Sequence, residues 1–358
     1  MSKDIGEASI NRLCEWSDDS KLVVVNFFGG EPLLNMDLIR HLILYGIEKA
    51  KSEGKKIQFS MTSNGTLFTD RIVDFLNEHR VSVLVSMDGP KQVQNMNRPF
   101  RSGKGSFDAI KSNIQKLLAT RPTLTARATL TRDCMSLKVL VDGLRDVGFQ
   151  YVHIEPVTPD KNCSFALSEK DFKTLKKEYD HLGEIFLENV SSGTPFGFSN
   201  ILRTLSAIYS SSVRHYPCGA GKNLMAVDPN GSIYLCHRFT GMEEFSLGTV
   251  YDPDFSLQKK IFEAHVDARD ECRTCWARHL CGRGCWYENY IYTGHIDEPY
   301  SAKCDLFKHV AALSMVIFSK LHEKDKALLD RMFRKNDPLS RRGEVPEEPH
   351  ENVKEVIR

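Results

Sequence analysis

KLVVVNFFGGEP (21–32) sets the pattern of the first half of the chain, because an apolar run typical of a buried strand leads directly into two glycines and a carboxylate. Similar runs follow at IQFSM (57–61), VSVLVSM (81–87), LTARATL (124–130) and YVHIEPV (151–157). Helical patterns lie at about 2–16, 35–53, 69–79, 106–119, 136–147, 169–190 and 199–212. Strands alternating with helices at a spacing of roughly 25 to 45 residues predict parallel βα units and an α/β fold.

The segments that follow these strands are polar. In such folds the loops after the carboxyl ends of the strands hold the functional residues. Here they supply Gly29, Gly30, Glu31, Ser63, Asn64, Ser86 and Asp88, while Arg127 and Glu155 lie within the fourth and fifth strands. Each segment alone could form only a turn. Together they predict a ligand site along one rim of a barrel.

Composition narrows the class of protein. The chain has 358 residues, of which 41% are hydrophobic, enough for a sizeable core and about two domains. Its 48 basic and 47 acidic residues give a net charge of +1, so we expect neither nucleic acid nor a membrane surface as a partner. The N-terminus lacks the apolar core of a signal peptide, and we expect a cytoplasmic protein.

The alternation of strands and helices stops near residue 200. NLMAV (223–227) and SIYLC (232–236) flank Asp228-Pro229-Asn230-Gly231 and predict a β-hairpin. We therefore expect a barrel at residues 1–205, a second domain at 213–310, and a C-terminal helix with a charged tail at 311–358.

Seven of the ten cysteines fall in this second domain and follow a regular spacing. They are Cys218 and Cys236, then Cys272-x2-Cys275-x5-Cys281-x3-Cys285, then Cys304. Thiolates at such spacing bind zinc or iron-sulfur clusters. Two zinc ribbons would need an eighth ligand, which His237 could supply. The other three cysteines, Cys14, Cys134 and Cys163, have no such spacing, and we expect ordinary buried thiols.

The pattern C-x12-G-x4-C, C-x2-C-x5-C-x3-C and C resembles the SPASM domain of radical S-adenosylmethionine (SAM) enzymes. GGEP, SNG and SMDGPKQVQNMNRPF (86–100) are similar to the SAM-binding elements of the same family. The resemblance covers about residues 1–310. It implies an α/β fold: a partial (βα)6 TIM-type barrel lacking its first strand, followed by a small cysteine-rich SPASM domain with a β-hairpin and helices.

The resemblance also implies residue roles. Gly29, Gly30 and Glu31 would meet the methionyl amino group of SAM, and Ser86 and Arg98 would hold the rest of the molecule, the forked Arg98 guanidinium suiting a carboxylate. The same SAM-binding elements contain Ser63, Asn64 and Asp88. Arg127 would assist, or would form a structural ion pair.

Two auxiliary 4Fe-4S clusters are implied as well. Cys272, Cys275, Cys281 and Cys304 would hold one cluster completely. Cys218, Cys236 and Cys285 would hold the other, leaving one iron to His237 or open to a peptide cysteine thiolate.

The family likeness is greatest to maturases that form thioether bonds in ribosomally made peptides, including those acting on the quinohemoprotein amine dehydrogenase small subunit. It implies a peptide or protein substrate and a reductant such as flavodoxin or ferredoxin. Sulfatase-maturing enzymes, which form formylglycine, are the alternative, although they carry an aspartate where this chain has His237. His237 and Glu155 are the candidate catalytic bases, while Glu155 could equally be a structural carboxylate. A non-catalytic iron-sulfur or zinc protein that binds peptides or transfers electrons is the alternative of another class.

One motif of the family is not in the sequence. Radical SAM enzymes bind the cluster that cleaves SAM through Cx3Cx2C after the first strand, but here Cys14 is followed next by Cys134. We therefore expect Met1 to be an internal methionine of a truncated form, with SAM binding weakened or lost and no radical chemistry by this chain alone. Codons for Cx3Cx2C upstream of Met1 would restore the enzyme.

Overall fold

Six parallel strands stand side by side in chain order and form one curved sheet in the computed structural model, which describes residues 1–159, 163–194, 196–324 and 326–333. The strands are β1 (Leu22–Phe27), β2 (Lys56–Ser63), β3 (Ser82–Ser86), β4 (Thr125–Leu130), β5 (Tyr151–Pro156) and β6 (Gly197–Phe198). The five strands expected from sequence are confirmed. The two-residue β6, paired to β5, is too short to produce a recognisable pattern.

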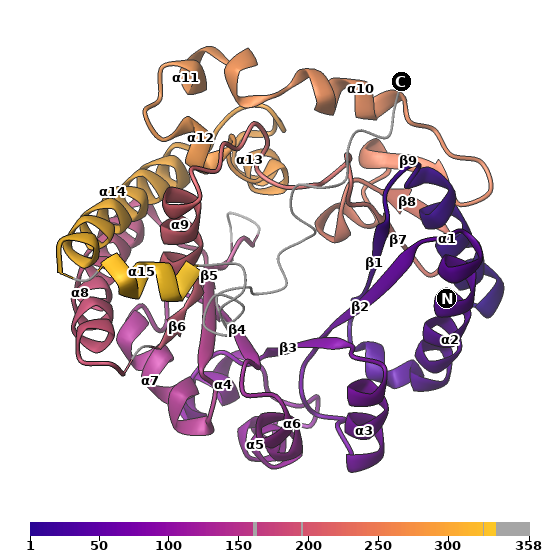
Figure 1. Ribbon diagram of the computed structural model, residues 1–358, viewed down its shortest axis with the longest axis horizontal. Coiled ribbons are helices and arrows are strands. Elements are labelled where there is room, and N and C mark those ends of the chain that lie inside the picture. Colours follow the sequence, from indigo (N-terminus) through magenta and orange to yellow (C-terminus); the bar gives the residue numbers. More distant parts are fainter. Residues whose placement is uncertain (160–162, 195, 325, 334–358) are drawn as a thin grey trace.

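Helices cover the outer side of this sheet (Figure 1). They are α1 (Lys3–Trp16), α2 (Met36–Ser52), α3 (Asp70–Glu78), α4 (Lys91–Asn97), α5 (Phe107–Asn113), α6 (Gln115–Thr120), α7 (Leu137–Val147), α8 (Glu169–Ser191) and α9 (Ser199–Tyr209), with the short 3-10 helix η1 (Pro32–Asn35) before α2. The helix expected at 106–119 is divided in two at Ile114. This arrangement confirms the α/β fold and the partial barrel.

A long helix, α14 (Ser301–Lys324), packs against α8 and α9 and is followed by α15 (Lys326–Phe333). Its Leu306, Val310, Ile317 and Leu321 side chains are buried in the core of the barrel. Gly183 of α8 allows this close packing, since a Cβ there would lie 2.9 Å from the Leu313 side chain. The charged tail predicted at 340–358 lies outside the described residues, and the division into domains stays a prediction.

A cysteine-rich unit, residues 213–300, closes the arc at the upper edge of Figure 1. It contains β7 (Ala226–Val227), β8 (Ser232–Tyr234), β9 (Ser246–Thr249), η2 (His237–Phe239), η3 (Glu243–Phe245), α10 (Ser256–Glu263), η4 (Val266–Ala268), α11 (Asp270–Arg273), α12 (Arg278–Cys281) and α13 (Trp286–Thr293). β7 and β8 form the predicted hairpin. Its turn is fixed by Asp228 Oδ1, which accepts hydrogen bonds from Asn230 N at 2.8 Å and Ser232 N at 2.9 Å.

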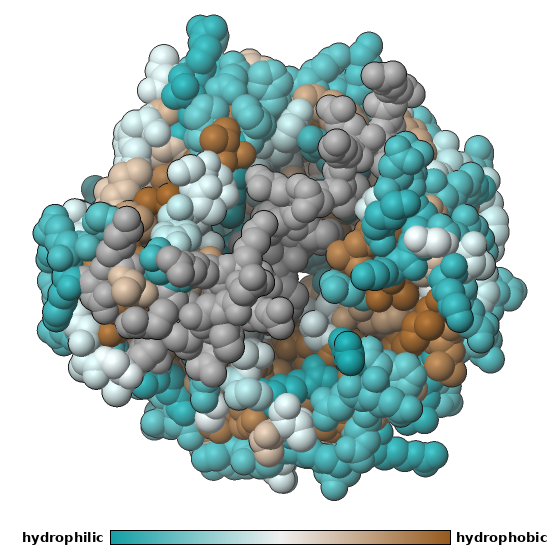
Figure 2. All heavy atoms as spheres, viewed as in Figure 1, coloured by the Kyte–Doolittle hydropathy of each residue, from teal (hydrophilic) through white to brown (hydrophobic). Residues whose placement is uncertain are grey.

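Helix α1 joins this unit to the barrel. Arg12 Nε donates to Val250 O at 2.8 Å, and the Trp16 and Phe255 rings pack edge to face with their centroids 5.0 Å apart. Hydrophilic side chains dominate the outer rim in the space-filling view, while apolar groups appear mainly between the elements nearer the centre (Figure 2). Within the described residues, no helix has the length and apolar character needed to cross a membrane.

Candidate functional site

A cavity of about 310 Å³ opens where the strands end and the cysteine-rich unit meets them. Seven of the nine residues predicted to bind SAM line it, and so do both candidate bases, His237 and Glu155. The predicted SAM-binding residues in its wall are Gly29, Gly30, Ser63, Asn64, Ser86, Arg98 and Arg127. Its volume lies within the usual range for small-molecule sites. The ends of separate strands therefore converge on one space large enough for a ligand.

The remaining two predicted residues, Glu31 and Asp88, lie behind the wall and hold it together. Glu31 Oε1 accepts from Ser63 Oγ at 2.9 Å, and Glu31 Oε2 accepts from Asn64 N at 2.7 Å. The Leu33 amide also donates to Glu31 Oε1, at 3.1 Å. Glu31 thus ties the loop after β1 to the end of β2.

The paired glycines leave their side of the cavity open. A Cβ added at Gly29 or Gly30 would meet no atom within 4 Å. Gly29 has a φ of +146°, which favours glycine, whereas Gly30 lacks a positive φ. Packing within the protein does not explain why Gly30 has no side chain, and the adjoining space fits a ligand that approaches the backbone closely.

Asp88 holds Arg98 at the cavity. Its side chain is only 2% exposed, and its Oδ2 accepts from Arg98 Nε at 2.8 Å. Asp88 Oδ1 accepts from Thr129 N at 2.9 Å, and Arg98 Nη2 donates to Thr129 Oγ1 at 3.2 Å. The guanidinium is therefore fixed in orientation by β3 and β4, as recognition of a carboxylate requires.

Glu155 is an ionised carboxylate in the cavity wall. His153 Nε2 lies 2.8 Å from its Oε1, and Ser199 Oγ lies 3.3 Å from His153 Nδ1. Burial alone would raise the pKa of Glu155, but His153, Lys303 and Arg127 together hold that pKa well below its usual range. Glu155 carries a negative charge at neutral pH and can accept a hydrogen bond or a proton.

His237 reaches the cavity from the cysteine-rich unit and packs on Phe28, which follows β1, with ring centroids 4.4 Å apart. Burial lowers the pKa of His237 to about 4, and the charges of Arg238 and Arg127 add to the shift. The imidazole is neutral at pH 7, so its nitrogens are able to coordinate iron or accept a proton.

Arg238, Glu288, Lys303 and Thr158 also join the barrel to the cysteine-rich unit, and sequence reasoning did not find them. Glu288 Oε1 lies 3.3 Å from Arg238 Nη1 and 3.1 Å from Lys303 Nζ, and it accepts from Thr158 Oγ1 at 2.9 Å. Only one signal was available for Arg238, namely its position next to His237. The other three carry no motif.

Four of the seven patterned cysteines interact with one another: Cys272, Cys275, Cys281 and Cys304. Burial raises the pKa of the Cys281 thiol to about 11, and the neighbouring Cys304 and Cys272 thiols add to the rise. Burial likewise raises the pKa of Cys304, with contributions from Cys272 and Cys275. These interactions join the same four residues that the resemblance assigns to one cluster.

Among the three cysteines predicted to hold the second cluster, the structure shows only some of the expected contacts. Burial raises the pKa of Cys285 to about 11, and Glu288 and Cys236 add to the rise while Arg238 opposes it. Cys218 packs against the same hydrophobic core that contains Cys236. The ligand roles of all seven cysteines stay predictions. Of the three cysteines outside the pattern, Cys14 is buried as expected, whereas Cys134 and Cys163 are only partly buried, so the expectation of buried thiols was wrong for these two.

The surroundings of the four-cysteine group fit a sulfur-rich cluster. Arg269 Nη1 lies 3.9 Å from Cys272 Sγ, while its Nε and Nη2 are buried without an acceptor, as is Arg283 Nε. The backbone amides of Arg283 and Gly284 donate toward Cys281. Sulfide and thiolate sulfurs accept such bonds, which help to set cluster potentials.

Comparison with known proteins adds independent support. Residues 7–132 match the model of the radical SAM superfamily. A cysteine-type anaerobic sulfatase-maturating enzyme of Clostridium perfringens is 25% identical over 279 residues, covering 72% of this chain and 72% of that protein. The radical SAM cyclopropyl synthase TigE of Paramaledivibacter caminithermalis is 28% identical over 322 residues, covering 86% of this chain and 62% of that protein.

A solved structure described as native anSMEcpe with bound AdoMet and Cp18Cys peptide has the same fold. It superposes with a TM-score of 0.77 at 19% identity and covers 90% of this chain and 91% of that one. The chain therefore carries a radical SAM domain, and over most of its length it is similar to a sulfatase-maturating enzyme and a radical SAM cyclopropyl synthase, which confirms the resemblance drawn from its sequence.

Proposed function

We propose that the cavity binds SAM beside a cysteine-containing peptide and that the chain is the barrel and cysteine-rich part of a maturase forming a thioether crosslink in that peptide. Because the sequence lacks Cx3Cx2C, this chain alone should not cleave SAM. One observation carries the proposal: the strand-end residues expected to hold SAM share a single cavity with His237 and Arg238 of the cysteine-rich unit. A ligand held by the strand ends would therefore lie next to the unit that carries the predicted clusters.

Within this proposal, Arg98 binds the SAM carboxylate while Gly29 and Gly30 let the methionyl group approach the backbone. Cys272, Cys275, Cys281 and Cys304 hold one 4Fe-4S cluster. Cys218, Cys236 and Cys285 hold a second, which can take a peptide thiolate or His237 as its fourth ligand. Such clusters supply electron transfer and a Lewis-acidic iron. The donor set is appropriate, because the thiols are buried and clustered and metal binding drives their deprotonation.

The bonds, hydrogens and electrons of the proposed reaction balance. A peptide S–H bond and a C–H bond break, and one S–C bond forms. The hydrogen atom goes to the adenosyl group of SAM, and the thiol proton goes to a base in the cavity. Glu155 and His237 both line the cavity and are the candidates for that base, although their lowered pKa values make each a weak base at neutral pH. The released electron equals the one that a flavodoxin or ferredoxin supplies to cleave SAM.

Calorimetry of SAM binding to the anaerobically purified chain tests the first step, with Arg98→Ala as the comparison. Wild type should bind SAM, although weakly because the Cx3Cx2C cluster is absent, and the variant should bind at least tenfold more weakly still, because one charged hydrogen bond contributes about 1.5–3 kcal/mol. Equal affinities would refute the assignment of the cavity. Iron and sulfide analysis tests the clusters, for which about eight of each per chain are expected from two 4Fe-4S centres.

Turnover is tested with the chain extended by whatever in-frame codons precede Met1, using mass spectrometry of candidate cysteine-containing peptides. A peptide that has lost a pair of hydrogens supports thioether formation. Conversion of cysteine to formylglycine would instead support the sulfatase-maturase alternative, and intact peptide with consumed SAM would contradict both.

A further inference from the structure

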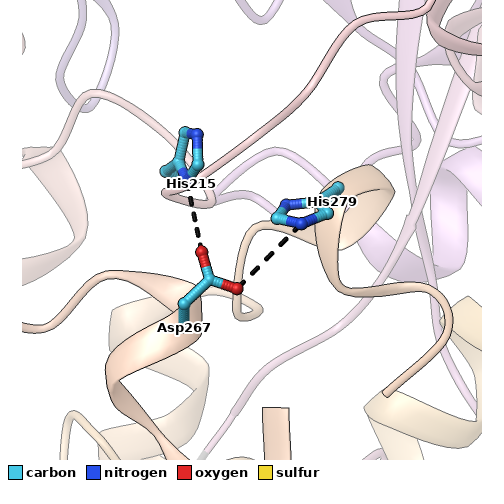
Figure 3. Close-up of side chains that lie close together, drawn as sticks. All are labelled: His215, Asp267 and His279. Atoms are coloured by element: carbon cyan, nitrogen blue, oxygen red, sulfur yellow. Dashed lines mark ion pairs between the residues drawn. The ribbon is translucent and has the colours of Figure 1, made fainter. Parts of the chain in front are cut away.

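Three potential metal ligands meet in the cysteine-rich unit, and one of them, His279, lies between Cys275 and Cys281 in the sequence. His215 lies in the segment before the hairpin, Asp267 in η4 and His279 in α12. One ligand atom from each lies within 4.8 Å of the other two, which no other trio of His, Cys, Asp and Glu residues in the described chain achieves (Figure 3). The sequence analysis did not single out any of the three.

Backbone hydrogen bonds hold the three segments together independently of these side chains. Val266 N donates to His215 O at 2.8 Å, and Arg214 N donates to His279 O at 2.8 Å. η4 and α12 are thus both tied to the segment that enters the cysteine-rich unit. The backbone fold itself therefore brings the three ligand-bearing segments together.

The side chains converge in a manner that suits a small cation. His215 Nδ1 lies 3.4 Å from Asp267 Oδ2, and His279 Nε2 lies 4.0 Å from Asp267 Oδ1, so both rings direct a nitrogen at the carboxylate (Figure 3). A tetrahedral zinc ion with bonds of 2.0–2.1 Å places its ligand atoms about 3.3 Å apart. The first distance already matches this value, and the ligand atoms of all three residues lie within 4.8 Å of one another.

Arg278 already forms an ion pair with Asp267 at this site. Its Nε lies 3.1 Å from Asp267 Oδ1 and holds one carboxylate oxygen in place. Oδ2, on the His215 side, is the oxygen available to a metal. An arginine bonded to the second oxygen of a ligating carboxylate orients that ligand, as outer partners commonly do at metal sites.

We propose that His215, Asp267 and His279 bind one divalent transition-metal ion of the zinc class, with water in the fourth position. Two imidazoles and a carboxylate are typical zinc ligands. The ion would clamp the segment that leaves the barrel to η4 and α12. None of the three is a predicted iron-sulfur ligand, although His279 and Cys281 both lie in α12, and the proposal does not depend on the proposed function.

The test uses the full chain purified anaerobically with its iron and sulfide. Wild type, the double variant His215→Ala/His279→Ala and a control, His265→Ala, are equilibrated with zinc and desalted. Zinc, iron and sulfide are then measured, together with zinc X-ray absorption. His265 is a suitable control because it directly precedes η4 but does not belong to the trio.

Wild type and the control should retain one more zinc per chain than the double variant, with equal iron and sulfide. The zinc should have a nitrogen and oxygen shell at about 2.0–2.1 Å. Equal zinc in all three proteins, or a sulfur shell at about 2.3 Å, would overturn the proposal. Should the double variant lose iron and sulfide, the single variant His215→Ala replaces it, since that side chain is 55% exposed. The melting temperature should then rise with zinc in wild type and not in His215→Ala, and an equal rise in both would refute the site.

Discussion

Asp88 Oδ2 accepts a hydrogen bond from Arg98 Nε at 2.8 Å, joining the end of β3 to the end of α4. Asp88 itself does not line the cavity, whereas Arg98 does. The aspartate in the SMDGP segment therefore acts by orienting the arginine that follows it ten residues later.

Although Asp88 does not line the cavity, Asp88→Asn should accordingly weaken SAM binding. The variant keeps an oxygen for Thr129 N but loses the charge opposite Arg98, at a cost of about 1.4 kcal/mol, or tenfold in affinity. Calorimetry measures the loss. Lys91→Ala, which breaks an exposed ion pair with Asp108, is the matched control and should bind SAM normally. Unchanged affinity in Asp88→Asn would show that Arg98 is held adequately by other contacts.

Gly30→Ala separates a folding role from a binding role. Its backbone lacks a positive φ, and an added Cβ meets no protein atom within 4 Å, so the melting temperature should be unchanged. A bound ligand would collide with the new methyl group, and overpacking costs about 1–3 kcal/mol, so the dissociation constant of SAM should rise by roughly 5-fold to 150-fold. A variant that binds SAM as wild type does would place the ligand elsewhere.

Much of the fold follows from local sequence signals. The strands of the barrel are continuous apolar runs, and α8 begins with a capping box between Ser168 and Asp171 that marks its start. The division of the 106–119 helix and the short β6 could not be predicted, because each depends on packing rather than on periodicity. The hairpin was predictable because Asp228 and Gly231 carry specific turn chemistry.

The site could be predicted where residues follow strands and not where distant segments meet. Gly30, Asn64 and Ser86 lie at successive strand ends, so topology alone brings them together. Glu288 joins Thr158, which is 130 residues earlier in the chain, and nothing in either local sequence signals that contact. Long-range hydrogen bonds of this kind can be identified only from the structure.

Glu155→Gln should make the melting temperature less sensitive to a fall in pH. The pKa of Glu155 is held below its usual range in the folded chain, so its ionised form stabilises the fold above the ordinary carboxyl pKa of about 4.3, and that contribution is lost as pH falls below it. The melting temperature of wild type should exceed that of the variant by a constant margin from pH 8 to about pH 5 and converge with it in stronger acid. A margin that does not change with pH would assign the loss to packing.

His237→Ala tests whether the imidazole coordinates iron. If His237 is the fourth ligand of the three-cysteine cluster, its removal should change the electron paramagnetic resonance signal of that cluster while iron content stays near wild type. His295→Ala, a histidine of the same unit that lines a different cavity, should leave the signal unaltered. A spectrum identical to wild type would exclude His237 as a ligand and leave it as a base or a packing partner of Phe28.

Arg269→Leu should lower the reduction potential of the four-cysteine cluster. The guanidinium is 7% exposed, lies 3.9 Å from Cys272 Sγ, and has two further nitrogens without an acceptor. Its positive charge and N–H groups would favour the more negative, reduced cluster, so their removal favours the oxidised form. The shift should be on the order of 59 mV for each 1.4 kcal/mol of lost interaction, read from a potentiometric titration. Arg273→Leu is the matched control, because Arg273 is the last residue of α11, four residues after Arg269, and is exposed in a pair with Asp270. Equal potentials in the two variants, with equal iron content, would mean that Arg269 does not donate to the cluster.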